Sequence, residues 1–227
     1  DSRIDALLST WQWGDSNGTS INLTYSFPTI GSTWVSDYFS DKPLSASFLN
    51  TTQQQDVRNA LQSWSNVANI SFTEVFEPEV QGDIRFTFSE SFPENTLGVA
   101  FFPPSSTFVS EEPGDIWLNA EKSSDLSFGT EGYDTLLHEL GHALGLKHSF
   151  ESTGNNSSTL PNLESTSQFT IMANNANDNY DGAGWVRNGD TNFFLKVPNT
   201  TPMLLDIAAM QFLYGANTSY NTGDNIY

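Results

Sequence analysis

The sequence predicts an α+β domain with a mixed upper lobe, about residues 1–148, and a loop-rich lower lobe, about residues 149–217. Segments with the two-residue period of strands and segments with the helical period occur together in the first region, whereas Ser, Thr and Asn dominate much of the second. With 227 residues, 37% of them hydrophobic and 13% aromatic, the chain is long enough to bury one substantial core. We expect residues 218–227 to be a tail or the start of a missing C-terminal region.

Five segments of the upper lobe are predicted to be strands. In the first, apolar residues at positions 21, 23, 25 and 27 alternate with polar ones, as in a half-buried strand. In the third, Ile84, Phe86 and Phe88 alternate in the same way. The five predicted strands are Ile21–Phe27, Ile70–Phe76, Asp83–Ser89, Leu97–Phe102 and Asp115–Asn119.

A helix is predicted after the first strand. Thr52 and Gln55 have the spacing of a capping box, in which two side chains satisfy free backbone N–H groups at a helix start. Apolar residues then recur three or four positions apart, so they share one face that we expect to pack on the core. These residues are Val57, Leu61, Trp64 and Ala68.

Two more helices are predicted, one on each side of the change in composition. The segment of about residues 131–146 has a stripe of leucines, two acidic residues in its first turn and Gly145 as a C-terminal stop. Residues 149–168 and 174–190 are predicted to be long loops because polar and turn-forming residues dominate them. A last helix is predicted over Met203–Tyr214, with Gly215 as its cap.

Composition excludes several classes of protein. With 27 acidic and 8 basic residues, the formal net charge of −19 would repel nucleic acid and anionic lipid surfaces. The chain has no Cys, which excludes disulfides, zinc–thiolate sites and thiol nucleophiles. No apolar run approaches the roughly 20 residues that a membrane-spanning helix needs. We therefore expect no nucleic-acid partner and no membrane insertion.

The segment from His138 to His148 reads HELGHALGLKH and matches the extended zinc-protease pattern HExxHxxGxxH. Residues four apart lie one turn above each other on a helix, so His138 and His142 can bind the same zinc ion. A chain that leaves the helix at Gly145 can bring His148 back as a third ligand and leave coordination positions open. Glu139 then lies beside the metal, where it can act as general base toward a zinc-bound water.

Chance is a poor explanation for this pattern. The chain has only three His, and all three occupy its ligand positions. Random placement of three residues would give that spacing in about one case in ten thousand, before Glu139 and Gly145 are required. The residues therefore predict one catalytic zinc ion per chain.

At these residues the chain resembles the metzincin zinc endopeptidases, and among them the serralysins, which are secreted bacterial proteases. Further segments carry the same resemblance: Leu23–Phe27, Leu61–Ile70, Gly114–Asn119 and Asp206–Gly215. Phe169–Met172 resembles the Met-turn, in which the side chain of Met172 would lie beneath the zinc site. The resemblance implies a catalytic domain over residues 1–217, with a twisted, mainly parallel sheet and two long helices in the upper lobe and a C-terminal helix in the smaller lower lobe.

Matrixins are the alternative family. Ser149 directly after the third His is more like matrixins than like serralysins, which usually have Pro there. The 24 residues from His148 to Met172 favour serralysins, whose connection is long. Serralysins also carry a C-terminal calcium-binding β-roll, and Thr222–Tyr227 resembles the entry to that region, but no glycine-rich nonapeptide repeat follows.

One departure from serralysins bears on catalysis. They usually have a Tyr two residues after the Met-turn Met, where it ligates zinc at rest, and this chain has Asn174. The second hypothesis is therefore a zinc-binding pseudoprotease or protein-binding module that has lost catalysis. Calcium remains a second metal to consider, because residues 174–182 offer the hard oxygen ligands that it takes.

The resemblance implies a secreted, extracellular zinc-dependent endopeptidase that hydrolyses peptide bonds of extended polypeptides. The backbone of Gly98, Val99 and Ala100 would form the edge strand that pairs with the substrate. A propeptide or a proteinaceous inhibitor is a further expected partner, and we expect a monomer.

Overall fold

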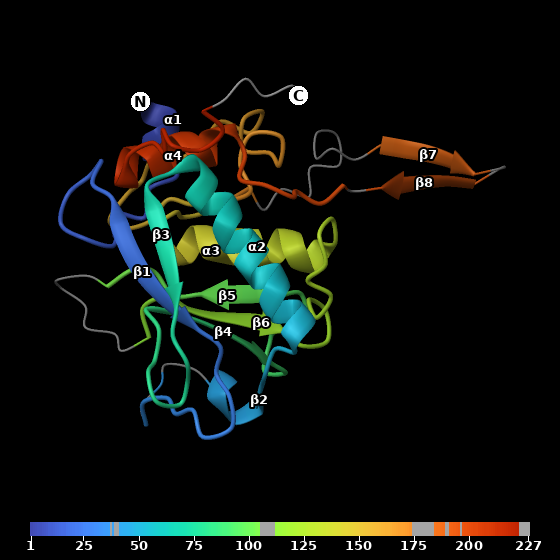
Figure 1. Cartoon of the computed structure of the whole chain (residues 1–227). Helices are drawn as coiled ribbons and strands as arrows, with labels where there is room; N and C mark the ends of the chain where they lie inside the picture. Colours follow the sequence, from blue (N-terminus) through green and yellow to red (C-terminus); the bar gives the residue numbers. More distant parts are fainter. Residues whose placement is uncertain are drawn as a thin grey trace.

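The computed structural model describes residues 1–36, 38, 41–104, 112–173, 184–188, 191–195 and 197–222, with the backbone alone for the two ranges between 184 and 195. Figure 1 shows a twisted sheet with helices laid against it. The sheet has six strands in the order β3-β1-β4-β6-β5, with β2 paired to β4. Its strands are β1 (Ile21–Ser26), β2 (Ala46–Ser47), β3 (Ile70–Glu74), β4 (Ile84–Ser89), β5 (Gly98–Ala100) and β6 (Asp115–Asn119).

The sheet is mainly parallel, which confirms the predicted fold class. β1 runs parallel to β3 and β4, and β4 runs parallel to β6. β5 is antiparallel to β6, and β2 is antiparallel to β4. All six residues of β4 and all five of β6 are buried, as expected for central strands that are covered on both faces. β5 is the last strand of this order, so one of its edges has no strand beside it in the described chain.

Two long helices, α2 (Thr51–Val67) and α3 (Glu131–Ala143), pack on the sheet and against each other (Figure 1). The predicted core face of α2 is buried, and Trp64 is among the largest fully buried side chains. The helix starts earlier than predicted, because Asn50 and Gln53 form its capping box in place of Thr52 and Gln55. The Asn50 side chain accepts from the backbone N–H groups of Thr52 and Gln53.

Helix α3 ends at Ala143, before the predicted residue 146. Gly145 terminates it with a φ of +107°, a left-handed conformation that favours glycine. A Cβ at this position would also lie 2.5 Å from the carbonyl oxygen of Trp11. The reversal of the chain between His142 and His148 therefore requires a residue that tolerates a positive φ and has no Cβ, and Gly145 meets both conditions.

The lower region is loop-rich and contains helix α4 (Leu204–Tyr214), which ends at Gly215 as predicted. The short helix α1 (Ser2–Asp5) lies beside α4, and Leu8 forms an antiparallel bridge with Leu146 (Figure 1). The sequence patterns did not predict α1, the 3₁₀ helix Lys42–Ser45 or the two-residue strand β2. Within the described part of the chain, no helix is both long and apolar enough to cross a bilayer.

The prediction of a continuous loop over residues 174–190 is wrong for its last part. β7 (Gly184–Asn188) and β8 (Thr191–Leu195) form an antiparallel two-stranded sheet. A signal was present in the sequence, since the spacer Gly189-Asp190 between two strand-like segments is typical of a tight hairpin. The many Asn, Asp and Gly residues before Gly184 favoured a loop over the whole range, so this hairpin signal was not used.

Candidate functional site

The structure brings the three predicted zinc ligands together. The Nε2 atom of His148 lies 3.2 Å from Nε2 of His138 and 3.2 Å from Nε2 of His142. His138 and His142 lie one turn apart on α3, and His148 approaches after the chain reverses at Gly145. His142 is buried, and the other two are half-buried. The three rings thus turn the same type of nitrogen toward one point.

The outer nitrogen of each ring has its own partner. Nδ1 of His138 donates to the carbonyl oxygen of Ile171 at 2.6 Å, and Nδ1 of His142 donates to that of Leu146 at 2.7 Å. Because a carbonyl oxygen only accepts, these two rings carry their proton on Nδ1 and keep the Nε2 lone pair for a metal. Nδ1 of His148 instead faces the Glu151 carboxylate at 3.3 Å.

These residues fit a zinc ion. Neighbouring nitrogens around a tetrahedral zinc with bonds of about 2.0–2.1 Å are about 3.3 Å apart, close to the spacing of the three rings. Two of the rings are also shifted toward the neutral form that a metal ligand needs. Burial, followed by the neighbouring His138 and His148, holds the pKa of His142 well below 6.5. Burial also lowers the pKa of His148, although Glu151 opposes the shift.

Glu139 follows His138 on α3, and its carboxylate is buried. Its Oε2 atom has no hydrogen-bond partner among the described residues. Burial raises the pKa of Glu139 to about 8, whereas a hydrogen bond from the backbone of Ala100 opposes the shift. A divalent cation on the three histidines would also oppose it, because a nearby opposite charge favours the ionised carboxylate.

Strand β5 lies directly over Glu139. A Cβ added to Gly98 would lie 2.8 Å from Cγ and 2.9 Å from Oε1 of Glu139. Glycine at this position therefore allows the strand and the carboxylate to approach each other. From sequence, Gly98 was assigned only a backbone role toward substrate, and this second contact was not foreseen.

Met172, which is predicted to belong to a Met-turn, is fully buried against α3. A Cβ on Gly141 would lie 2.6 Å from its sulfur, so the helix presents its smallest residue to the methionine. Asp206 of α4 holds this turn: its carboxylate accepts from the Thr170 hydroxyl at 2.5 Å and from the backbone N–H of Ile171 at 2.9 Å. Sequence reasoning placed Asp206 in a family-like segment but gave it no role.

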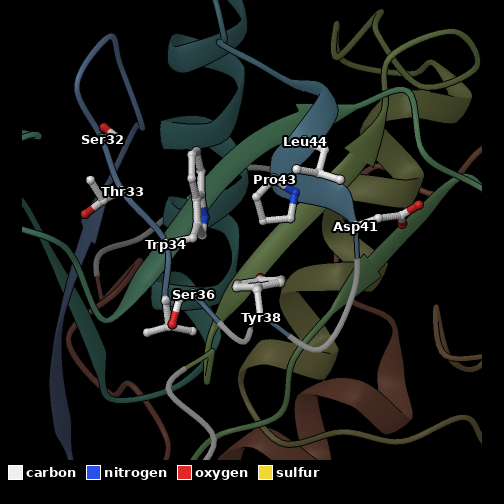
Figure 2. A pocket seen from close by; sticks show the side chains of 9 residues that line it. Ser32, Thr33, Trp34, Ser36, Tyr38, Asp41, Pro43 and Leu44 are labelled. Carbon is white, nitrogen blue, oxygen red and sulfur yellow. The ribbon is translucent and has the colours of Figure 1, made fainter.

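A separate cavity of about 450 Å³ lies beside the segment that precedes the 3₁₀ helix. Figure 2 shows Trp34, Tyr38, Pro43 and Leu44 around it. Tyr38 donates to the buried Asp115 carboxylate at 2.9 Å and accepts from the indole N–H of Trp117. None of the predicted site residues lines this cavity.

Several sequence predictions concern parts of the chain outside the described residues. Asn174, at the usual position of the serralysin Tyr ligand, is one of them. The calcium candidates at 174–182 and the last five residues of the tail are the others.

Comparisons with known proteins match a family model and several named metalloproteases. Residues 39–177, more than half of the chain, match the peptidase M10 family, described as matrixin. Over 96% of its length the chain is 30% identical to serralysin of Proteus mirabilis and 34% identical to a serralysin C of Dickeya chrysanthemi. It is also 30% identical over 96% of its length to metalloprotease AprA of Pseudomonas entomophila. The chain spans 44–45% of the length of these three relatives.

Proposed function

Because this chain belongs to the peptidase M10 family and is a serralysin-like metzincin, we propose that it is the catalytic domain of a zinc endopeptidase that cleaves extended polypeptides. One observation carries the proposal: the Nε2 atoms of His138 and His142 each lie 3.2 Å from Nε2 of His148, and Glu139, the residue after His138, is buried. The proposed domain comprises residues 1–217, with lobes that meet near residue 148.

The chain's own residues have distinct proposed roles. His138, His142 and His148 hold the metal, and Met172 supports the floor of the site. When bound, a zinc ion would polarise the scissile carbonyl and lower the pKa of a water molecule in the site. The Glu139 carboxylate accepts a proton from the attacking water and later gives it to the departing amine nitrogen.

Strand β5 is the proposed binding edge for substrate. The backbone groups of Leu97 and Phe101, on either side of it, bond to β6. Since alternate residues of an antiparallel strand direct their backbone groups to opposite edges, Gly98 and Ala100 face away from β6. An extended peptide can then add to this edge as another strand, and its scissile bond would lie near Glu139.

The test is the variant Glu139→Gln, which keeps the shape of the side chain and removes its basicity. We expect its kcat for cleavage of a protein substrate to fall at least 100-fold, the lower end for loss of a general base, with zinc content unchanged. Full activity in this variant would contradict the proposed role. Wild-type protein that holds one zinc ion and cleaves nothing would instead favour the pseudoprotease or binding-module hypothesis that Asn174 raised.

Secretion is also part of the proposal. It follows from the resemblance to serralysins and is tested by quantifying the protein in culture medium and in washed cells. Retention inside the cells would contradict it. A propeptide or inhibitor partner and a monomeric state remain predictions, and size-exclusion chromatography with light scattering tests the latter.

A further inference from the structure

Lys147 directly precedes His148, the third zinc-ligand candidate, and is fully buried, with an exposed fraction of 0%. Its ammonium donates to three carbonyl oxygens at short range, those of Ala6 at 2.7 Å, Glu151 at 2.6 Å and Ser158 at 2.8 Å. The carbonyl oxygen of His148 lies farther away, at 3.3 Å. A lysine is almost never fully buried unless its charge is compensated.

The compensation here comes from backbone dipoles. No carboxylate lies within 4 Å of the Lys147 ammonium among the described residues. The three N–H groups of the ammonium therefore make three short hydrogen bonds to carbonyl oxygens. This arrangement resembles the oxygen ligands around a bound metal cation. Removing the ammonium would leave the buried carbonyl oxygen of Ala6 and the part-buried ones of Glu151 and Ser158 without this donor, which is more costly than losing one exposed bond.

The carbonyl groups belong to segments that are far apart in the sequence. Ala6 is part of the N-terminal segment. In the same segment, the carbonyl oxygen of Leu7 accepts a hydrogen bond from the backbone N–H of Lys147 at 2.8 Å. Glu151 and Ser158 belong to the loop after His148. The amide of Asn156 adds bonds to the carbonyl oxygens of Asp5 at 2.6 Å and Leu8 at 2.8 Å. Lys147 is therefore the charged centre at which both segments meet.

His148 depends on this loop more than the other two histidines do. His138 and His142 are fixed by backbone carbonyl oxygens, whereas His148 faces the side-chain carboxylate of Glu151, which is 49% exposed. The ring of Phe150 stacks on His148 at a centroid distance of 5.1 Å. Both neighbours come from the three residues after His148, where the short bond from Lys147 to the Glu151 carbonyl oxygen fixes the backbone.

We propose that Lys147 is a positioning residue for the third zinc ligand: its buried ammonium acts as a built-in cation that orders residues 148–158 and thereby holds His148, Phe150 and Glu151 at the metal centre. The proposal rests on the proposed zinc site. It does not depend on peptide hydrolysis, so it can fail while the protease assignment stands, and it can hold for a zinc protein without activity.

The first test compares Lys147→Met, which has similar length and no charge, with the matched control Lys122→Met at an exposed lysine. Zinc release to a chromophoric chelator is measured at a temperature where each variant is folded by circular dichroism. We expect release from K147M to be at least tenfold faster than from wild type, as is typical for lost outer-shell support, and release from K122M to be unchanged. Absorption bands of the Co²⁺-substituted protein should also shift in K147M, because they report ligand geometry directly.

A second test separates charge from shape and remains informative if K147M does not fold. The chain has no Cys, so Lys147→Cys introduces a single thiol that can be modified under denaturing conditions. Alkylation with 2-bromoethylamine restores a lysine-like ammonium, and alkylation with 1-iodopropane gives a neutral side chain of the same length. Both products, and wild type taken through the same procedure, are refolded with zinc.

We expect the aminoethyl product to recover the wild-type zinc-release rate within about threefold and the Co²⁺ bands with it, whereas the propyl product should not recover them. Equal recovery by both products would overturn the proposal, as would failure of the aminoethyl product when wild type refolds. A lower melting temperature of K147M with unchanged zinc release and unchanged Co²⁺ bands would also overturn it, since Lys147 would then only stabilise the fold.

Discussion

The carboxylate of Asp206 accepts a hydrogen bond from the backbone N–H of Ile171 at 2.9 Å, and the carbonyl oxygen of that same residue accepts from Nδ1 of His138 at 2.6 Å. A helix of the lower region is thus connected to a zinc-ligand candidate through the backbone of a single residue, Ile171. The position of α4 and the orientation of the His138 ring are coupled by these two bonds.

Asp206→Ala should weaken both stability and metal binding. The substitution leaves the buried Thr170 hydroxyl and the Ile171 N–H without their acceptor, which costs about 1–3 kcal/mol for each buried group left unpaired. We expect a lower free energy of unfolding in urea and faster zinc release than in wild type. Unchanged zinc release with reduced stability would show that the Met-turn holds His138 without Asp206.

Gly98→Ala should reduce turnover and leave the zinc content unchanged. The new Cβ would lie 2.8 Å from Cγ of Glu139, so strand β5 or the carboxylate must move. Displacement of a catalytic group by about 1 Å can cost up to 100-fold in rate, and we expect kcat to fall at least tenfold. The matched control is Gly154→Ala, where nothing lies within 4 Å of the added Cβ and activity should be unchanged. Wild-type kcat in G98A would contradict the close approach of β5 to Glu139.

Metal removal should abolish activity and lower stability together. A ligand that binds only the folded state at 1,000 times its dissociation constant contributes about 4 kcal/mol. Dialysis against a chelator should therefore reduce the melting temperature, and adding zinc should restore both properties. Magnesium should restore neither, because imidazole nitrogens suit zinc and poorly suit hard cations. A melting temperature that does not respond to zinc would contradict a metal site on the three histidines.

Stability at acid pH should depend on the ion pair between Glu77 and Arg85. Both side chains are buried, and Nε and Nη2 of Arg85 each donate to a different carboxylate oxygen at 2.8 Å. Burial favours a higher pKa for Glu77, but the hydrogen bonds from Arg85, Ser32 and Ser26 outweigh it and hold the pKa below 4.5. Because the folded state lowers this pKa, the pair stabilises the protein fully above pH 4.5 and loses its effect as pH falls through the folded-state pKa.

Glu77→Gln tests this pair. At pH 7 the variant should lose up to about 3–5 kcal/mol, because the buried Arg85 charge loses its closest partner and keeps only the Asp115 carboxylate, 3.8 Å from its Nη1. The difference between wild type and variant in urea unfolding should then shrink as pH is lowered below 4.5. A difference that is constant with pH would show that ionisation of Glu77 does not contribute.

Local sequence patterns predicted much of the fold and the three ligand candidates. Strand β6 spans Asp115–Asn119 as predicted, and α4 ends at Tyr214 as predicted, because alternation and helix-end glycines act within a few residues. His138 and His142 lie on one helix, so their relation is also local, and the left-handed Gly145 explains the return to His148.

The support around the ligands could not be predicted in this way. Lys147 bonds to Ala6, which is 141 residues away in the sequence, and Asp206 bonds to Thr170 and Ile171, which are 36 and 35 residues away. Nothing in the local pattern around these residues identifies their acceptors or donors. Lysine side chains are usually exposed. Lys147 is buried because the N-terminal segment and the loop after His148 both cover it.

The most direct test of the account is cleavage of unfolded casein by the purified chain, with zinc determined on the same sample and a chelator-treated control. We predict cleavage that the chelator abolishes and zinc restores, with about one zinc ion per chain. One zinc ion per chain with no cleavage would contradict the assigned enzyme activity. Cleavage that survives complete removal of zinc would contradict the role of the three histidines.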